Sequence, residues 1–553
     1  MSRDCVAYHC RNSHAFAVAL VVVTLIVGCA HPAEETRVST IAEATVAWTA
    51  TPTDESAISP TSTPTQEPDP FTVQVDLTAP QGEISPFIYG MSGAPTEVIE
   101  DLHLNLVSWG GNPSSRYNWE IGNAWNAGSD WYYQNTDYGL EGNVADRTAE
   151  QANQLGAAVR LALPTLGWVA KDADPATCSF PLEAGGCGNA DGANCSEPGA
   201  IADPTHANVA TDVPWVERWV GHLIADKGFD IAFFAMDNEP ELWGYTHYDV
   251  HPTCTTYQEI LDTYLRYATA VRQLAPDSEL LGPVTCCWWF YWNSAAGEQD
   301  KAQHGNQDFL RWFLDHVRRH DDAAGLRTLD VLDIHYYPEG LYNDLEDADS
   351  QAHRVRSTRS LWDPTYVDES WIAEPIQLVP RMRELITAHY PGTKLGISEW
   401  NFGAETTIPG ALAIADALGI YGREGVYLAA YWRYPPVDSA GYQAFKMYTN
   451  YDDRGGQFLG QALPADVGEI PSLDAYAAYQ LDEGQLLLML VHKSPESSAG
   501  VHLALRGADL PKRLNAYQLA DGYESIHHQE LILDDRITLP PYSITLLEID
   551  VEA

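Results

Sequence analysis

Short apolar segments recur along the chain from about residue 86, and helical patterns separate most of them. Eight segments have the length and composition of strands: Phe87–Gly90, Leu104–Trp109, Ala157–Pro164, Ile231–Met236, Leu280–Val284, Val331–Tyr336, Lys394–Trp400 and Val426–Trp432. Most are continuous apolar runs, which is typical of strands covered on both faces of a sheet. Eight strands that alternate with helices predict an α/β fold, a (β/α)8 TIM-like barrel over residues 86–436. A doubly wound parallel sheet is the alternative.

The helix expected before the fourth strand illustrates the pattern. Its apolar residues follow a spacing of three and four, at Val213, Val216, Val220, Leu223 and Ile224. Asp212 can cap its start, Pro214 suits its first turn, and Gly228 can end it.

The pattern changes after the eighth strand, where short strands follow one another with turn residues between them. They are Gln485–Val491, Val501–Leu505, Ala516–Leu519, Glu530–Leu533 and Ile544–Ile549. This spacing is typical of an antiparallel sandwich, so residues 437–553 are expected to form a second, smaller all-β domain. The alternating segment Phe71–Leu77 could add a strand to it, so residues 71–85 are expected to join the small domain.

The first residues have the pattern of a secretion signal. Arg3 and Arg11 precede an apolar run from residue 15 to residue 27, which is shorter than the roughly 20 residues of a membrane-spanning helix. A lipoprotein signal peptide over residues 1–28 is therefore expected. Its end, Ile26-Val27-Gly28-Cys29, resembles the bacterial lipobox, in which the signal is cleaved before the cysteine and the sulfur receives a lipid. A plain secretory signal with an incidental cysteine is the alternative.

Residues 29–70 are expected to form a disordered tether. Five Thr and five Pro make up half of the twenty residues from 51 to 70. Such a composition cannot bury enough surface to offset its ordering entropy. Signal and tether together predict an extracytoplasmic protein that is attached to a bacterial membrane through a lipid anchor only.

Six cysteines remain when Cys5 and Cys10 of the signal and the lipid-bearing Cys29 are set aside. They are Cys178, Cys187, Cys195, Cys254, Cys286 and Cys287. An even number outside the cytoplasm favours disulfides, but six cysteines allow 15 pairings and the sequence does not choose among them.

The composition narrows the class of ligand. With 77 acidic and 31 basic residues, the chain would repel nucleic acid and anionic lipid, so a neutral or cationic ligand is expected. With 45% hydrophobic and 20% charged residues, a chain disordered throughout and a protein with many membrane spans are excluded. The 17 Trp and 29 Tyr suit a ligand with apolar faces and hydroxyl edges, such as a sugar, although aromatic residues also fill cores. We expect a monomer that binds a polysaccharide.

Two glutamates end predicted strands, where barrel enzymes place their chemistry. The fourth strand runs into Asp237-Asn238-Glu239-Pro240 and the seventh into Ser398-Glu399-Trp400-Asn401. Two carboxylates across a cleft are the minimum for cleaving a glycosidic bond: one protonates the leaving oxygen, and the other attacks the anomeric carbon or activates water. Glutamates that only cap helices or form salt bridges are the alternative.

Further candidates surround these carboxylates in the predicted barrel. Asn238 could bond the 2-hydroxyl of the reacting sugar, and His335 and Tyr337 could orient or polarise the nucleophile. The candidate sugar-stacking residues are Trp432, Trp243, Trp125 and Trp131, against the alternative that they pack in the core. No G-x-S-x-G and no P-loop motif occurs, so serine hydrolase and nucleotide-dependent chemistry lack support. No cofactor is expected.

Two segments have a weak resemblance to metal sites. His247 and His251 precede Cys254, but Pro252 argues against a fixed helical face for a zinc site. The acidic run from residue 344 to residue 349 could hold calcium, although a solvated loop is the favoured interpretation. No metal is expected.

Several segments together resemble glycoside hydrolase family 44, over about residue 71 to the end. They are Trp109-Gly110-Gly111-Asn112, Ser115-Arg116-Tyr117-Asn118-Trp119, Ala127-Gly128-Ser129-Asp130-Trp131, Asp237-Asn238-Glu239-Pro240, Leu242-Trp243, Thr246-His247, Asp333-Ile334-His335-Tyr336-Tyr337-Pro338 and Ser398-Glu399-Trp400-Asn401. The resemblance implies a barrel with a β-sandwich and a retaining endo-β-1,4-glucanase or xyloglucanase. It implies that Glu239 is the general acid/base and Glu399 the nucleophile, and it adds Asn112 to the candidate substrate-binding residues.

One position departs from the family's pattern. A basic residue usually precedes the Gly-Gly-Asn segment, near the nucleophile, whereas this chain has Ser108 there. A nearby cation would favour the ionised nucleophile, so the departure bears on rate and pH optimum. Family 44 belongs to the clan of retaining (β/α)8-barrel glycosidases. The alternatives are a hydrolase of the same clan that acts on mannan or arabinoxylan, an arabinofuranosidase, and a catalytically silent glycan-binding lipoprotein. The presence of both carboxylates favours the enzyme.

Overall fold

The computed structural model describes residues 71–139, 142–341, 345–468, 472–523, 525–533 and 536–551. The predicted signal peptide, the lipidation site Cys29 and the tether lie outside these residues. Within them, no helix is both long and apolar enough to cross a membrane.

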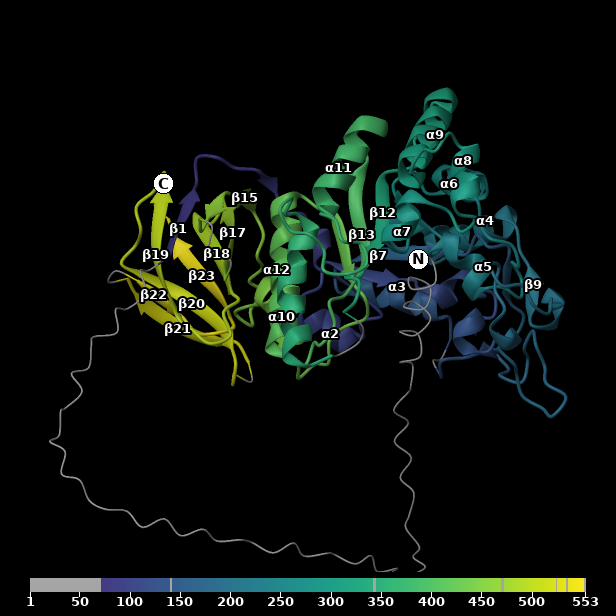
Figure 1. The fold of residues 1–553 in the computed structure, drawn as a ribbon, viewed down its shortest axis with the longest axis horizontal. Coiled ribbons are helices and arrows are strands. Elements are labelled where there is room, and N and C mark those ends of the chain that lie inside the picture. Colours follow the sequence, from purple (N-terminus) through teal and green to yellow (C-terminus); the bar gives the residue numbers. More distant parts are fainter. Residues whose placement is uncertain are drawn as a thin grey trace, which may run out of the picture.

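Eight parallel strands close into a barrel, which confirms the (β/α)8 fold and excludes the doubly wound sheet (Figure 1). In order around the barrel they are β3 (Gly90–Ser92), β4 (Leu106–Trp109), β7 (Ala158–Leu163), β10 (Phe233–Met236), β11 (Glu279–Thr285), β12 (Val331–Tyr336), β13 (Lys394–Trp400) and β14 (Leu428–Tyr431). Only the first strand differs clearly from its predicted range. Residues Pro86–Ile88 form a 3-10 turn, η2, because the Ser85 hydroxyl accepts from the N–H of Phe87 and proline at the first position favours the turn.

One barrel helix follows each barrel strand. In chain order they are α2 (Thr96–Asp101), α3 (Val144–Gln154), α4 (Val213–Gly221), α6 (Tyr257–Leu274), α9 (Phe309–Ala324), α11 (Leu378–His389), α12 (Ile408–Glu424) and α13 (Ala440–Thr449). The predicted cap of α4 is present, since Asp212 accepts from the N–H of Trp215. Further helices lie in the loops between strands: α5 (Trp243–Thr246), α7 (Trp288–Trp292), α8 (Glu298–Gln303) and α10 (Ala348–Ser357).

The eighth helix lies beyond the expected domain boundary at residue 436. Tyr442 and Lys446 of α13 both bond Asp101 at the end of α2, so this helix closes the ring around the barrel. The segment expected to be wholly β therefore begins with the last barrel helix.

Two sheets form the smaller domain, which confirms the predicted sandwich. One contains β16 (Ala465–Asp466), β1 (Phe71–Asp76), β19 (Ala499–Arg506) and β22 (Ile537–Leu539). The other contains β2 (Gly82–Glu83), β15 (Gln461–Leu463), β17 (Leu473–Gln480), β18 (Gln485–His492), β23 (Ser543–Asp550), β20 (Arg513–Ala520) and β21 (His527–Ile532). Because β1 pairs in parallel with β19, both ends of the chain build this domain. Strand β17 was not predicted, since its alanines have low β propensity.

The sandwich packs directly against the helix that follows strand seven of the barrel (Figure 1). Tyr476 of β17 donates to Asp416 of α12 at 2.6 Å, and the buried Lys493 ammonium lies 2.5 Å from the same carboxylate. Gly419 of α12 lies so close to the ring of Tyr476 that a Cβ there would overlap it. The smaller domain thus braces α12 and, through it, the strand that carries Glu399.

Two disulfides join four of the six candidate cysteines. Cys178 pairs with Cys187, and Cys195 pairs with Cys254. The second bond takes Cys254 out of any metal site with His247 and His251.

Candidate active site

A sharp turn after strand β10 brings Glu239 to the mouth of the barrel. Asp237 and Glu239 have positive φ angles of 71° and 46°, a conformation that side-chain-bearing residues adopt only where the surroundings hold them. Ser115 donates to the Asp237 carboxylate at 2.5 Å, and the N–H of Glu239 donates to the carbonyl of Val284 at 3.0 Å. The 3-10 helix η3 (Asn112–Arg116) and strand β11 therefore hold the turn.

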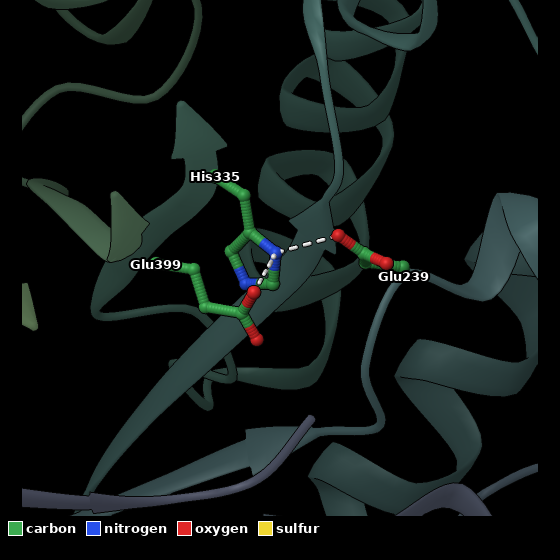
Figure 2. A group of neighbouring side chains, drawn as sticks. All are labelled: Glu239, His335 and Glu399. Carbon is green, nitrogen blue, oxygen red and sulfur yellow. Dashed lines mark hydrogen bonds and ion pairs between the residues drawn. The ribbon is translucent and has the colours of Figure 1, made fainter. Parts of the chain in front are cut away.

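Glu239, His335 and Glu399 meet at the carboxyl ends of strands β10, β12 and β13 (Figure 2). Nδ1 of His335 lies 2.8 Å from Oε1 of Glu239 and 3.4 Å from Oε2 of Glu399. One ligand atom from each of the three side chains lies within 4.8 Å of the other two. The glutamates are 3% and 4% exposed, so they face each other in a largely dehydrated space.

Nδ1 of His335 forms a hydrogen bond with Glu239 and an ion-pair contact with Glu399. Burial by itself lowers its pKa, but the charges of Glu399 and Glu239 and the bond to Glu239 outweigh burial, so the pKa lies above the ordinary value. Tyr337 adds a second bond to the nucleophile candidate, because its hydroxyl donates to Oε2 of Glu399 at 2.9 Å. The trio also has the donor types of a metal site. The neighbouring carboxylates, however, raise the pKa of His335, which favours the protonated ring over a metal ligand.

The short separation decides which chemistry the pair can do. Inverting glycosidases keep their carboxyl groups about 6.5–9.5 Å apart to admit a water, whereas retaining enzymes keep them about 5–5.5 Å apart. Oxygens of Glu239 and Glu399 within 4.8 Å of each other fit the second arrangement. Direct attack of one carboxylate on the sugar is therefore geometrically available.

A buried ion pair that the sequence reasoning missed lies beside Ser108. Arg160 of β7 contacts Asp333 of β12 at 3.1 Å and the Ser108 hydroxyl at 3.4 Å. Asp333 also accepts from the N–H of Ser398, next to Glu399, at 3.1 Å. The barrel interior thus has a guanidinium next to the position where the family's basic residue was expected. The sequence feature that could have predicted this ion pair is the charged Arg160 inside an apolar strand, because a buried charge needs a buried partner.

Glu241 is a second buried carboxyl that was not predicted. Burial raises its pKa to about 7, the hydrogen bond from the N–H of Cys286 opposes this, and the charge of Glu239 raises it further. The sequence feature that could have predicted it is its position as the second glutamate of Asn-Glu-Pro-Glu.

The two candidate asparagines have different surroundings. Asn238 is buried beside Glu239, and its Oδ1 has no hydrogen-bond partner within the described residues, so this oxygen can accept from a sugar hydroxyl. Asn112 donates to the carbonyl of Ala127 at 2.9 Å and to Asp130 at 2.7 Å. It therefore holds the loop that leads to Trp131.

The candidate tryptophans are not brought together. Trp432 is half-buried over Gly111, where a Cβ would overlap its ring, and Trp131 is 42% exposed. Trp125 is buried, with its ring centroid 4.4 Å from that of Tyr117. Trp243 is buried too and lines a separate cavity of about 370 Å³. Only Trp432 and Trp131 thus present ring surface for stacking.

Comparisons with known proteins bear on the family and the fold. The family model "Glycoside hydrolase family 44" matches residues 124–340. Beta-mannanase/endoglucanase A of Caldicellulosiruptor saccharolyticus is 29% identical over 475 residues, which are 78% of this chain and 35% of that protein. This chain covers 65% of the length of a second curated relative, so it spans less than two thirds of the length of both relatives.

Solved structures match nearly over their whole length. The bifunctional glucanase-xylanase CelM2 from a metagenome library is 33% identical with a TM-score of 0.82, over 87% of this chain and 99% of that one. A family 44 xyloglucanase from Paenibacillus polymyxa, solved with xyloglucan, is 27% identical with a TM-score of 0.75, over 87% of this chain and 100% of that one. With its barrel, its sandwich and its two facing glutamates, the chain belongs to glycoside hydrolase family 44.

Proposed function

We propose that the chain is a retaining, endo-acting glycoside hydrolase that cleaves β-1,4-glucan chains of the cellulose or xyloglucan type. The observation that carries the proposal is the approach of Glu239 and Glu399 to within 4.8 Å, with His335 between them. The names of similar proteins support the substrate class, since they include a glucanase-xylanase, a xyloglucanase and an endoglucanase with mannanase activity.

Each side chain has one part in the proposed reaction. Glu399 attacks the anomeric carbon while Glu239 protonates the leaving oxygen, and Glu239 then takes a proton from the water that hydrolyses the glycosyl-enzyme. The Tyr337 hydroxyl orients the attacking carboxylate, and His335 holds both carboxylates at their separation. Asn238 bonds the 2-hydroxyl of the reacting sugar.

The proposed sugar contacts outside the reacting subsite are Trp432 and Trp131. Both offer exposed ring surface, and Asn112 holds the loop that leads to Trp131. Trp125 and Trp243 act through packing instead, because their rings are buried.

The stereochemistry of the first product tests the mechanism. Attack by Glu399 inverts the anomeric carbon once and water inverts it again, so the β configuration is retained. Proton NMR should therefore detect the β anomer first, before mutarotation. An α anomer formed first would mean that a water lies between the carboxylates and that the double displacement is wrong.

A panel of polysaccharides with sizing of the products tests the substrate class. Endo-cleavage of β-1,4-glucan or xyloglucan should give intermediate oligosaccharides early in the reaction. Faster release of oligosaccharides from mannan or arabinoxylan would mean that the chain acts on another substrate of the clan. Binding without any product would favour a catalytically silent glycan-binding lipoprotein.

We also propose that the protein is a monomeric, extracytoplasmic lipoprotein, on the evidence of the lipobox-like sequence at Cys29 and the Thr/Pro-rich segment behind it. Cys29→Ser should shift the activity from the membrane to the soluble fraction with kcat unchanged, since residue 29 precedes the folded domains. Fractionation followed by assay of both fractions measures this. A mature wild-type protein whose mass includes no lipid would contradict the anchor.

A further inference from the structure

Two consecutive cysteines lie at the end of strand β11, beside the active-site carboxyls. The Sγ atoms of Cys286 and Cys287 are 2.9 Å apart, closer than nonbonded sulfur atoms normally pack. Cys286 is 1% exposed, whereas Cys287 is partly exposed. The pair therefore consists of one partly exposed cysteine and one buried cysteine.

The other four cysteines of the described residues are already joined as Cys178–Cys187 and Cys195–Cys254. Such bonds form and persist in oxidising compartments. Two sulfurs in contact within the same protein are exposed to the same oxidants, so the same chemistry is available to them.

The segment that contains this pair supports the catalytic groups at three points. The carbonyl of Val284 accepts from the N–H of Glu239 at 3.0 Å, and the N–H of Cys286 donates to the carboxyl of Glu241. The hydroxyl of Tyr291 donates to the carbonyl of His335. A change in the backbone between residues 284 and 291 would therefore reach both the proposed acid/base and its histidine.

This support segment is itself under strain. Val284 has a φ angle of 63°, which is unfavourable for a β-branched residue and persists only where neighbouring structure enforces it. The register between β11 and β12 also shifts next to Val284. A covalent link two residues further on would limit the conformations that the segment can adopt.

We propose that Cys286 and Cys287 form a vicinal disulfide, and that this bond keeps the support segment in the conformation that positions Glu239 and His335. The bond itself is independent of the enzyme's activity, and only its effect on catalysis rests on the proposed function.

The bond forms by thiol–disulfide exchange with a small-molecule or protein disulfide. The partly exposed Cys287 thiolate attacks a sulfur of that oxidant, which breaks the oxidant's S–S bond, forms a mixed disulfide and releases one thiol. The Cys286 thiolate then attacks the Cys287 sulfur and releases the second thiol. The two cysteines lose two protons and two electrons, and the oxidant gains both.

The vicinal bond should also be the most easily reduced of the three. Consecutive Cα atoms are about 3.8 Å apart across a trans peptide, below the usual disulfide range of roughly 4.4–6.8 Å. The other two bonds join Cα atoms 6.0 and 5.0 Å apart, within that range. Disulfides outside the usual geometry have higher reduction potentials, so a mild reductant should open this bond first.

Peptide mapping tests the bond directly. Trypsin releases residues 273–301 as one peptide, which contains Cys286 and Cys287 and no other cysteine. After alkylation of the unreduced protein, this peptide should carry no alkyl group and be lighter by two hydrogens than the dithiol. After reduction it should take up two alkyl groups. Two alkyl groups without reduction, or a link from this peptide to another, would overturn the proposal.

Steady-state kinetics tests the effect on the active site. A reductant concentration that opens only this bond should lower kcat several-fold, up to about tenfold, with little change in KM, because small displacements of catalytic groups are costly. The double variant Cys286→Ser, Cys287→Ser should have the low kcat and no response to reductant, while a Cys178→Ser, Cys187→Ser variant should still respond. An unchanged wild-type kcat on opening the bond would refute the supporting role. If neither state hydrolyses any glycan, the proposed function fails, whereas the peptide mapping still decides the bond.

Discussion

Glu399→Ala is expected to lower kcat on β-glucan by at least about 10³-fold, because the variant has no nucleophile to form the glycosyl-enzyme. The carboxylate lies across from Glu239 and accepts from Tyr337, so no neighbouring side chain can replace it. Initial rates of reducing-end formation measure the loss.

Azide provides a sharper readout of the same variant. In the space left by the side chain, azide can attack an activated aryl β-glycoside from the α face and give an α-glycosyl azide. Glu384→Ala, which removes an exposed glutamate from helix α11, is the matched control and should keep its activity. A Glu399→Ala protein that folds like the wild type and retains more than a tenth of its rate would assign the nucleophile elsewhere.

The barrel and its carboxylates could be predicted because both depend on local patterns. Continuous apolar strands ended by turn residues placed Glu239 and Glu399 at strand ends, and the closed barrel brings those ends together. The nearness of His335 and Tyr337 follows from the same register, since both lie at the end of β12, next to the strand of Glu399.

What could not be predicted depends on contacts between distant segments. Trp125 and Trp243 lie beside catalytic motifs in the sequence, but their rings are buried by loops whose conformations no local pattern specifies. The disulfide Cys195–Cys254 spans 59 residues and needs those same loops. The partnership of Arg160 with Asp333 likewise appears only when the barrel closes, because their strands lie on different sides of it.

The histidine between the carboxylates bears on how Glu239 changes from acid to base during the reaction. When Glu399 becomes an ester, it loses its charge, and Glu239 becomes a carboxylate in the same step because it gives its proton to the leaving oxygen. The negative charge beside His335 therefore moves from Glu399 to Glu239. The donor at Nδ1 then faces a single carboxylate, Glu239, at 2.8 Å. His335 thus lies beside the charged carboxylate in both steps: Glu399 before the attack, and Glu239 when it next acts as the base.

Glu239→Ala should separate protonation from attack. On polymer, where the leaving alcohol needs a proton, kcat is expected to fall by about 10²–10⁴-fold. On an aryl glycoside with a good leaving group, glycosyl-enzyme formation needs no acid, so this step should be nearly unchanged. The second step still lacks its base, and the intermediate should accumulate as a burst of released phenol in pre-steady-state measurements.

The dependence on the leaving group is what assigns the two glutamates. A plot of the logarithm of kcat/KM against the pKa of the leaving phenol should be much steeper for Glu239→Ala than for the wild type, because bond cleavage without protonation leaves charge on the departing oxygen. Glu399→Ala should lose rate on every substrate alike. Equal slopes in wild type and Glu239→Ala would exclude Glu239 as the acid, and a steep slope in Glu399→Ala instead would reverse the two roles.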